Sequence, residues 1–316
     1  MSFSRIGPPP AAYYPRDREG VLNIAQSWYE PQLVALNLEQ IKQIPKGEIQ
    51  SPDSTQISLD IAQQTPLTDA TEFAIAMGAI NHMFWALDET GHFVRYEHRG
   101  RTGALAMSYA FEQAWQDRNS PIRRAIDYSE PLTLDGIHAV FGPIPDPEGR
   151  RQILNEILLS YELAAVGEQV EDMAQKGHVF DTSFAAQLAD LFPLGYADEV
   201  LKKAQLATSV IWRSARVRGY ACPPCSLTAF ADYQIPNVMR ALGVLKYSPG
   251  LAQKIDAGHL IESNSIEEEA IRGASILAIE ALSQAQGVAV ADVDYWIWLK
   301  RKEPQTPFHL TLTTYY

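Results

Sequence analysis

Apolar side chains recur at helical spacing through most of this chain. The clearest example is residues 149–167, where four of them follow the i, i+4, i+8, i+11 pattern of one helix face: Ile153, Ile157, Tyr161 and Ala164. We therefore predict a single long amphipathic helix across this stretch.

The same reasoning, together with helix-favouring composition and the placement of Pro and Gly, predicts most of the other elements. Further helices are expected at residues 71–87, 104–115, 133–141, 183–191, 198–216, 236–242, 248–257 and 266–284. Pro31 divides the helical pattern of residues 21–44 into two short helices. Residues 45–68 indicate a loop, and the residues of 92–96 and 308–316 favour strands. The prediction is a mainly α fold with a small β-sheet or hairpin.

The domain organisation follows from the absence of repeats and linkers. Residues 1–20 carry the run Gly7-Pro8-Pro9-Pro10 and are expected to form an extended N-terminal arm. No linker divides the remainder, so we predict a single domain over residues 21–316.

Composition narrows the classes of function. The chain has 316 residues, with 26 Lys and Arg against 38 Asp and Glu, and a net charge of −12. This balance argues against direct nucleic-acid binding. No apolar run reaches about 18 residues and no signal-peptide pattern is present, so neither a membrane span nor secretion is indicated, and we expect a cytoplasmic protein. Glycine-rich nucleotide-binding motifs are also absent.

The two cysteines offer little chemistry. Cys222 and Cys225 flank two prolines. A zinc site would need two more ligands at matching spacing, and the seven histidines supply no obvious pair. Two thiols near the end of a rigid loop are the preferred interpretation, so no metal site is expected.

Asp232 is the most unusual polar residue. It stands in the apolar segment 227–236, four residues before Pro236, which begins a predicted helix. A carboxylate beside a dry pocket activates water or stabilises a developing cation. An Asp at this place is also a common cap for a helix or the preceding turn. Both interpretations remain open on the local sequence.

A series of motifs in order resembles the queuosine salvage family, over about three quarters of the chain. The matching segments are Ile80-Asn81 with Phe84-Trp85, Arg99-Gly100-Arg101-Thr102, the stretch Arg151-Gln152-Ile153-Leu154-Asn155-Glu156, Phe192-Pro193 with Tyr196 and Asp198, Lys202-Lys203-Ala204-Gln205, Thr228 with Phe230-Ala231-Asp232-Tyr233 and Pro236, Leu242-Gly243 with Leu245 and Tyr247-Ser248, Glu268 with Ile271-Arg272, and His309 with Tyr315-Tyr316. Each motif alone is weak, whereas the ordered set is specific.

The resemblance implies an enzyme that cleaves queuosine 5′-phosphate to the base queuine and a ribose phosphate, without a cofactor, in base salvage for tRNA modification. It also implies a fold distantly like that of DNA glycosylases, although residues 242–245 make a poor hairpin of that kind. The partner is a small nucleotide, and the sequence sets no oligomeric state. Asp232 is the expected catalytic carboxylate, since cleavage builds an oxocarbenium-like sugar.

The resemblance also assigns substrate-binding residues. They are Asn81, His82, Trp85, Asp198, Lys202, Tyr233, Glu268, Arg272, His309 and Tyr316. Lys202 and Arg272 would neutralise the phosphate. The plainer alternatives are a solvated helix lysine and an i, i+4 ion pair with Glu268.

The remaining assignments carry the same kind of alternative. Trp85 and Tyr233 would stack on a flat heterocycle, with core packing as the alternative. Asn81 and His82 would contact sugar or base, although an Asn that only satisfies backbone groups fits equally well. His309 and Tyr316 would close the pocket.

Several charged positions of the family differ here. Gly78 replaces an Asp, Gln234 an Arg, Ala270 a Glu and Leu312 an Arg, while His82 replaces an apolar or aromatic residue. Carboxylates read N–H groups of a base and Arg reads phosphate, so these changes bear on the substrate. Two alternatives therefore stand beside the hydrolase: a non-catalytic nucleotide-binding protein on the same scaffold, and a hydrolase for another modified nucleoside.

Overall fold

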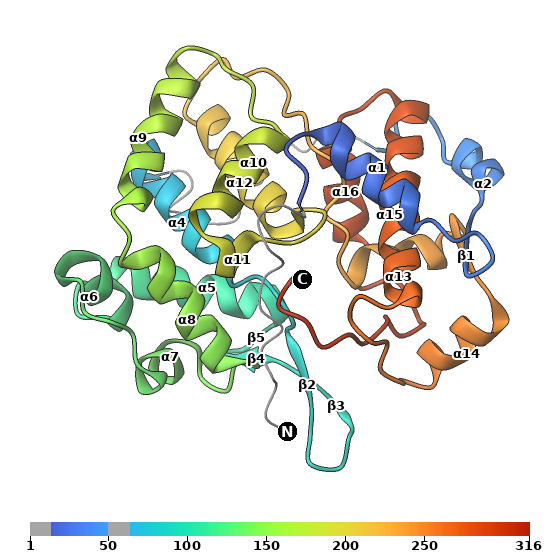
Figure 1. Cartoon of the computed structure of the whole chain (residues 1–316), viewed down its shortest axis with the longest axis horizontal. Helices are drawn as coiled ribbons and strands as arrows, with labels where there is room; N and C mark the ends of the chain where they lie inside the picture. Colours follow the sequence, from blue (N-terminus) through green and yellow to red (C-terminus); the bar gives the residue numbers. More distant parts are fainter. Residues whose placement is uncertain (1–13, 50–63) are drawn as a thin grey trace.

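The computed structural model describes residues 14–49 and 64–316. These residues form fifteen helices and three antiparallel sheets of two strands each. The mainly α prediction is confirmed. Figure 1 shows the helices gathered into two lobes that lie side by side.

The first lobe contains the middle of the chain. Its helices are α4 (Leu67–Ala79), α5 (Gly103–Gln116), α6 (Pro121–Tyr128), α7 (Leu134–Phe141), α8 (Pro147–Leu158), α9 (Glu162–Gln175), α10 (Thr182–Leu191), α11 (Pro193–Tyr196) and α12 (Lys202–Val217). Helix α4 is apolar on nearly every side and packs against α9 and α12. It forms the centre of this lobe.

The second lobe joins the two ends of the chain. Its elements are α1 (Arg18–Trp28), β1 (Val34–Leu36), α2 (Leu38–Gln43), α13 (Gln234–Ala241), β6 (Leu245–Tyr247), α14 (Pro249–Asp256), α15 (Ile266–Gln286) and α16 (Val290–Leu299). Strands β1 and β6 pair with Val34 opposite Tyr247. Helix α1 packs along α15 at Gly273, where a Cβ would lie 2.7 Å from the carbonyl oxygen of Ala25. The glycine therefore permits this close approach.

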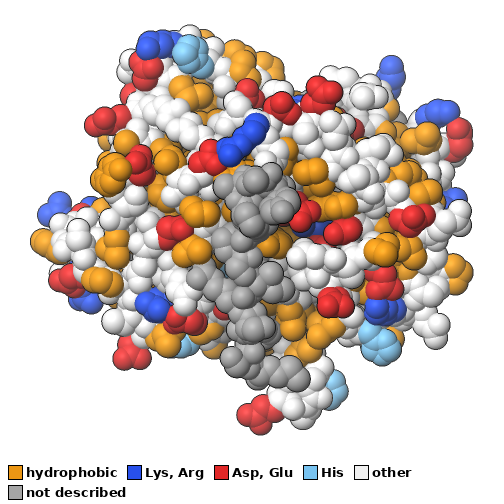
Figure 2. All heavy atoms as spheres, viewed as in Figure 1, with side chains coloured by type: hydrophobic (Ala, Val, Ile, Leu, Met, Phe, Trp, Pro, Cys, Tyr) orange, Lys and Arg blue, Asp and Glu red, His pale blue; other side chains and the backbone are white. Residues whose placement is uncertain are grey.

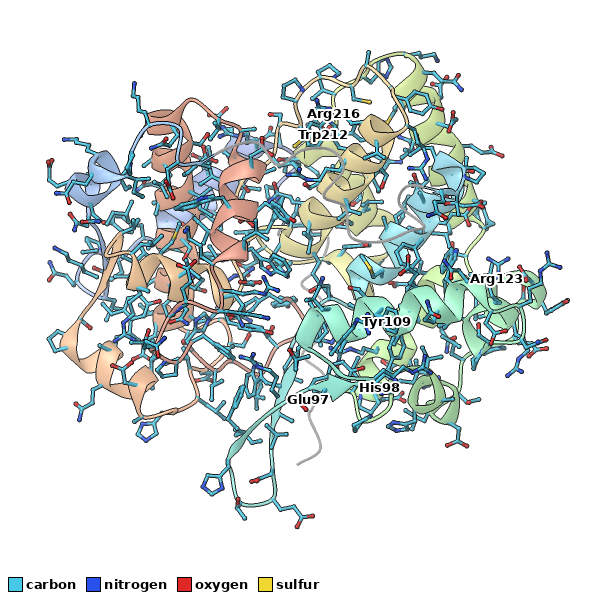
Figure 3. All side chains as sticks on the ribbon, turned by 180° about the vertical axis from the view of Figure 1, so that it is seen from behind. Glu97, His98, Tyr109, Arg123, Trp212 and Arg216 are labelled. Carbon is cyan, nitrogen blue, oxygen red and sulfur yellow. The ribbon has the colours of Figure 1, made fainter. Side chains whose placement is uncertain are left out.

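Two small hairpins belong to the first lobe. Strands β2 (Trp85–Leu87) and β3 (Phe93–Arg95) form the longer one, and β4 (Glu97–His98) pairs with β5 (Arg101–Thr102). Figure 3 shows Glu97 and His98 beside α5, which carries Tyr109. The predicted strand at 92–96 is confirmed as β3.

Most predicted helices are confirmed within a few residues. Thr133 caps α7 by accepting the N–H of Gly136, and Ser248 caps α14 in the same way. Helices α6, α11 and α16 were not predicted. Residues 242–245 connect a helix to a strand rather than two helices, so no helix-hairpin-helix is formed there.

The predicted helix at 71–87 is wrong in its second half. Helix α4 ends at Ala79, and the chain continues without helix into β2. Met83 has a φ of 37°, and its N–H donates to the carbonyl of Tyr316 at 3.0 Å. A contact with the C-terminus therefore replaces the next helical turn.

The single helix predicted at 149–167 is two helices. Helix α8 ends at Leu158 and α9 begins at Glu162, while Tyr161 is 83% exposed. Leu163, rather than Ala164, faces the core of the second helix. The apolar spacing therefore continues across a break between two helices.

The predicted C-terminal strand is also wrong. Residues 308–316 contain no strand; Leu310 alone forms an isolated bridge, to Leu260. The aromatic and Thr content favoured a strand, but no neighbouring strand is available to pair with it.

The N-terminal boundary needs a correction. Residues 1–13 lie outside the described residues, and α1 begins at Arg18 because the side chain of Asp17 caps it. Tyr14 is buried in the first lobe and donates to Asp190 at 2.5 Å. The segment from Tyr14 onward is therefore packed on the fold. Whether the two lobes act as one domain stays a prediction.

Acidic and basic side chains are interspersed over the described surface seen in Figure 2, without a broad basic patch on that face. Within residues 14–49 and 64–316, no helix by itself combines the length and hydropathy of a membrane span. The pair α15 and α16 meets that measure only when joined, across a bend of 108°.

Candidate active site

A cleft of about 1040 Å³ lies between the lobes. Helices α4, α5 and α12 line it from the first lobe, and α16, the start of α13 and the C-terminal segment line it from the second. Its charged and phenolic lining residues are Arg95, Arg101, Tyr109, Glu112, Lys202, Arg213, Asp232, Tyr233, Asp294, Tyr295, Arg301, Lys302 and Tyr316. The volume is that of a pocket for a small organic ligand.

Asp232 lines the cleft just before α13. Its Oδ1 accepts the N–H groups of Gln234 at 2.7 Å and Ile235 at 3.0 Å, which caps the helix. Its Oδ2 accepts no hydrogen bond from the residues that the structure describes, and the side chain is only partly buried. The capping interpretation therefore describes one oxygen of this side chain, and the catalytic interpretation stays a prediction.

Asp294 is a second carboxyl in the cleft, and it is not among the site residues predicted from the sequence. It lies on α16, is buried, and accepts the N–H of Phe230 on Oδ2 at 2.8 Å. Burial raises the pKa of Asp294 to about 7, and the charge of Asp232 adds to the rise, while Lys202 and Arg213 oppose it. The two carboxyls thus have different electrostatic environments.

Lys202 opens α12 and borders the same part of the cleft. Its Nζ donates to the carbonyl of Asn81 at 3.5 Å. Burial lowers the pKa of Lys202, whereas Asp232, Asp294 and Asp198 act to raise it. The buried ammonium group is therefore balanced by the carboxyls around it.

Aromatic rings form one wall of the cleft. The ring centroids of Tyr233 and Phe308 are 4.6 Å apart, and those of Phe308 and Phe93 are 5.7 Å apart. Trp85 stacks behind Phe93 at 6.2 Å and does not reach the cleft. Such a wall suits a flat heterocycle.

Cationic side chains also reach the cleft. Arg101 stacks on Tyr109 of α5 at 3.7 Å, and Arg301 stacks on Trp298 at 3.5 Å. Arg95, Arg213 and Lys302 line the cleft as well, although Arg213 is paired with Asp292. These cations suit an anionic group on the ligand.

A buried ion network adjoins the cleft at Tyr316. Arg272 donates to both oxygens of Asp198, at 3.0 and 2.9 Å, and its Nη1 lies 3.6 Å from Glu268. Tyr316 donates to Glu268 at 2.7 Å, and His309 Nε2 is 3.4 Å from the Tyr316 hydroxyl. All five side chains are at most 2% exposed. The network ties the C-terminus and α15 to the first lobe.

Both histidines predicted as site residues are neutral. Burial, with Arg150 nearby, holds the pKa of His82 well below its usual range, and burial lowers that of His309 to about 3. His82 Nε2 lies 3.2 Å from Asp146. Neither imidazole lines the cleft.

The structure brings together part of the predicted set. Five of these residues line the cleft: Asn81, Lys202, Asp232, Tyr233 and Tyr316. The others lie outside its lining: His82, Trp85, Asp198, Glu268, Arg272 and His309. In particular, Arg272 is engaged by two carboxylates and does not face the cleft.

The substituted positions have structural explanations of different kinds. At Gly78 a Cβ would lie 3.0 Å from the Tyr196 hydroxyl and 3.1 Å from Ala207, so a side chain has little room between α4 and α12. Tyr196 fills this space and donates to the carbonyl of Ile75. Gln234 lines the cleft, whereas Ala270 is packed in the second core and Leu312 against the C-terminal aromatic cluster.

The described residues contain no group of three His, Cys, Asp or Glu side chains that could hold a metal ion. Cys222 and Cys225 are free thiols. Burial raises the pKa of Cys225 to about 12, so it is protonated at neutral pH.

The arrangement defines a helical protein with a cleft between two lobes, where two carboxyls, an aromatic wall and several cations converge. The chain belongs to the queuosine salvage protein family, whose sequence model matches residues 61–316.

Two named relatives match most of the chain. The chain is 28% identical over 284 residues to a Mus musculus protein named queuosine 5′-phosphate N-glycosylase/hydrolase. The aligned region covers 78% of this chain and 82% of the mouse protein. A Sphaerobacter thermophilus protein of the same name is 26% identical over 269 residues, covering 77% and 80%.

Proposed function

We propose that this protein hydrolyses the N-glycosidic bond of queuosine 5′-phosphate and releases queuine in the cytoplasm, for use in tRNA modification. The names of its relatives support this substrate. The observation that carries the proposal is the free oxygen of Asp232 in a cleft that also offers an aromatic wall and cations.

The chemistry follows from where charge develops. As the bond from C1′ to the base breaks, its electron pair leaves with the base and the ribose becomes an oxocarbenium-like cation. The carboxylate of Asp232 stabilises that cation and orients a water molecule, whose oxygen then bonds to C1′. One of the water's protons passes to the carboxylate and on to solvent.

Binding is divided among the other cleft residues. The base stacks on the wall formed by Tyr233 and Phe308, and the 5′-phosphate is held by Lys202 or by the arginines at the cleft surface. Arg272 holds Asp198 and Glu268, and through Tyr316 it positions the C-terminal side of the cleft.

Gln234 favours a second candidate, a hydrolase for another modified nucleoside. It lines the cleft where the family pattern has Arg, so the set of ligand contacts there is altered. Both candidates keep Asp232 as the reaction centre.

Incubation of the protein with queuosine 5′-phosphate, queuosine and common nucleotides, followed by mass spectrometry of released bases, tests the proposal. We expect queuine from the 5′-phosphate. A base from a different nucleoside would instead favour the second candidate. No base from any of them, together with tight binding, would indicate a binding protein.

Phe308→Ala is expected to raise KM for the nucleotide by about tenfold, because stacking contributes about 1–3 kcal/mol per base. Steady-state kinetics measures this effect. Tyr161→Ala, which removes an exposed aromatic ring outside the cleft, is the control and should leave KM unchanged. An unchanged KM in the Phe308 variant would place the base elsewhere.

A further inference from the structure

Asp294 is a cleft carboxyl that the mechanism above does not use. It comes from α16 in the second lobe and is 4% exposed. The Phe230 N–H occupies its Oδ2, and no hydrogen bond from the described residues engages its Oδ1. Since the residue lines the cleft, one oxygen is held in place and the other is left for a ligand.

Cleavage of the glycosidic bond is helped by a proton donor for the departing base, and the ionised carboxylate of Asp232 does not supply that proton. The departing base carries the electron pair of the broken bond, and it leaves far more readily if it receives a proton at the same time. A carboxylate that stabilises the sugar cation must be ionised, so a second, protonated group is required for this step.

We propose that Asp294 is the general acid that protonates the departing base; this rests on the proposed function. The proton moves from the Asp294 carboxyl to the ring of the base as the C1′–N bond breaks. Water then adds to C1′ and gives a proton to Asp232, and Asp294 regains its proton from solvent. The sum is nucleotide plus water to free base plus ribose 5-phosphate.

The phenols that line the cleft and the two buried imidazoles fit this step less well. Burial raises the pKa of Tyr233 and of Tyr316 above the ordinary value of a phenol, which makes both weaker acids. The neutral imidazoles of His82 and His309 do not line the cleft. Asp294, with its pKa near 7, both holds a proton and releases it at neutral pH.

The pH dependence follows from the groups that face Asp294. These are Asp232 from the segment before α13, and Lys202 and Arg213 from α12; Asp292 and Tyr295 are the charged or phenolic neighbours on its own helix. The acid form of Asp294 is the active one, so kcat/KM should fall as pH rises above about 7.

The test compares two leaving groups in wild-type protein and Asp294→Asn. One substrate is queuosine 5′-phosphate, and the other is p-nitrophenyl riboside 5-phosphate, whose phenolate leaves without a proton. The Asn side chain still offers an oxygen to Phe230 N–H. We expect the variant to lose about 100-fold or more on the nucleotide. It should change by less than about 3-fold on the nitrophenyl compound and lose the decline above neutral pH.

Each outcome of this comparison supports or overturns the role of Asp294 as general acid. Equal losses on both substrates, or no loss on either, would overturn the role of Asp294 while leaving the proposed function intact. Wild-type protein that cleaves neither compound would overturn the proposed function and this inference with it. Asp256→Asn, a carboxylate of α14 outside the cleft lining, is the matched control and should behave as wild type.

Discussion

Asp232→Asn is expected to lower kcat for base release by about 10²–10⁴-fold and to change KM much less. The substitution removes the negative charge that stabilises the sugar cation. It keeps the cap, because the Asn oxygen still accepts the N–H groups of Gln234 and Ile235, and Asn is as good a cap as Asp. Steady-state kinetics on queuosine 5′-phosphate, with thermal unfolding to confirm the fold, measures the effect.

Asp181→Asn is the matched control for this variant. Asp181 caps α10 by accepting the N–H groups of Ser183 and Phe184, and it does not line the cleft. It has the same helix-capping role but lies outside the lining of the cleft. If Asp232→Asn kept full turnover, or if both variants lost activity equally, the cap would be the whole role of Asp232.

Arg272→Met should lower the free energy of unfolding by about 3–5 kcal/mol. The variant leaves Asp198 and Glu268 buried without their cation, and each is about 1% exposed. Removing one partner of a buried ion pair costs more than the pair contributes, because the remaining charge has lost its water as well. Urea unfolding followed by circular dichroism measures the change.

Arg124→Met provides the comparison for Arg272→Met. Arg124 pairs with Glu130 at 3.2 Å on the surface, where both side chains are about half exposed. An exposed pair of this kind contributes about 0–1 kcal/mol. Similar losses in the two variants would show that the buried network is not a special determinant of stability.

Local sequence signals, such as caps and apolar spacing, were enough to predict that the fold is mainly helical. The cap Thr133 and the apolar pattern after it lie next to each other in the chain, so α7 could be predicted from its own residues. The break between α8 and α9 could not, because Tyr161 continues the apolar spacing yet lies exposed at the start of the second helix. Spacing alone does not say where a helix turns away from the core.

Contacts between segments far apart in the sequence explain where the structure differs from the prediction at the end of α4 and at the C-terminus. The end of α4 depends on Met83, whose N–H meets the carbonyl of Tyr316, a residue at the other end of the chain. The same contact fixes the C-terminus without a strand. No property of either segment alone predicts this pairing.

In the candidate site, too, some residues could be predicted from local sequence, whereas others depend on contacts between distant segments. Asp232 was found because an acidic residue in an apolar segment before a helix is unusual. Asp294 gives the same signal within an apolar stretch, but helix α16 was not predicted and the residue was missed. The place of Arg272 in a buried network, rather than at the ligand, depends on Asp198 from a distant segment.

A crystal structure of the Asp232→Asn variant with queuosine 5′-phosphate tests the central claim most directly. The account predicts the ribose in the cleft between the lobes, with the side chain of residue 232 within about 3.5 Å of C1′. A nucleotide bound elsewhere, or a ribose turned away from residue 232, would contradict it.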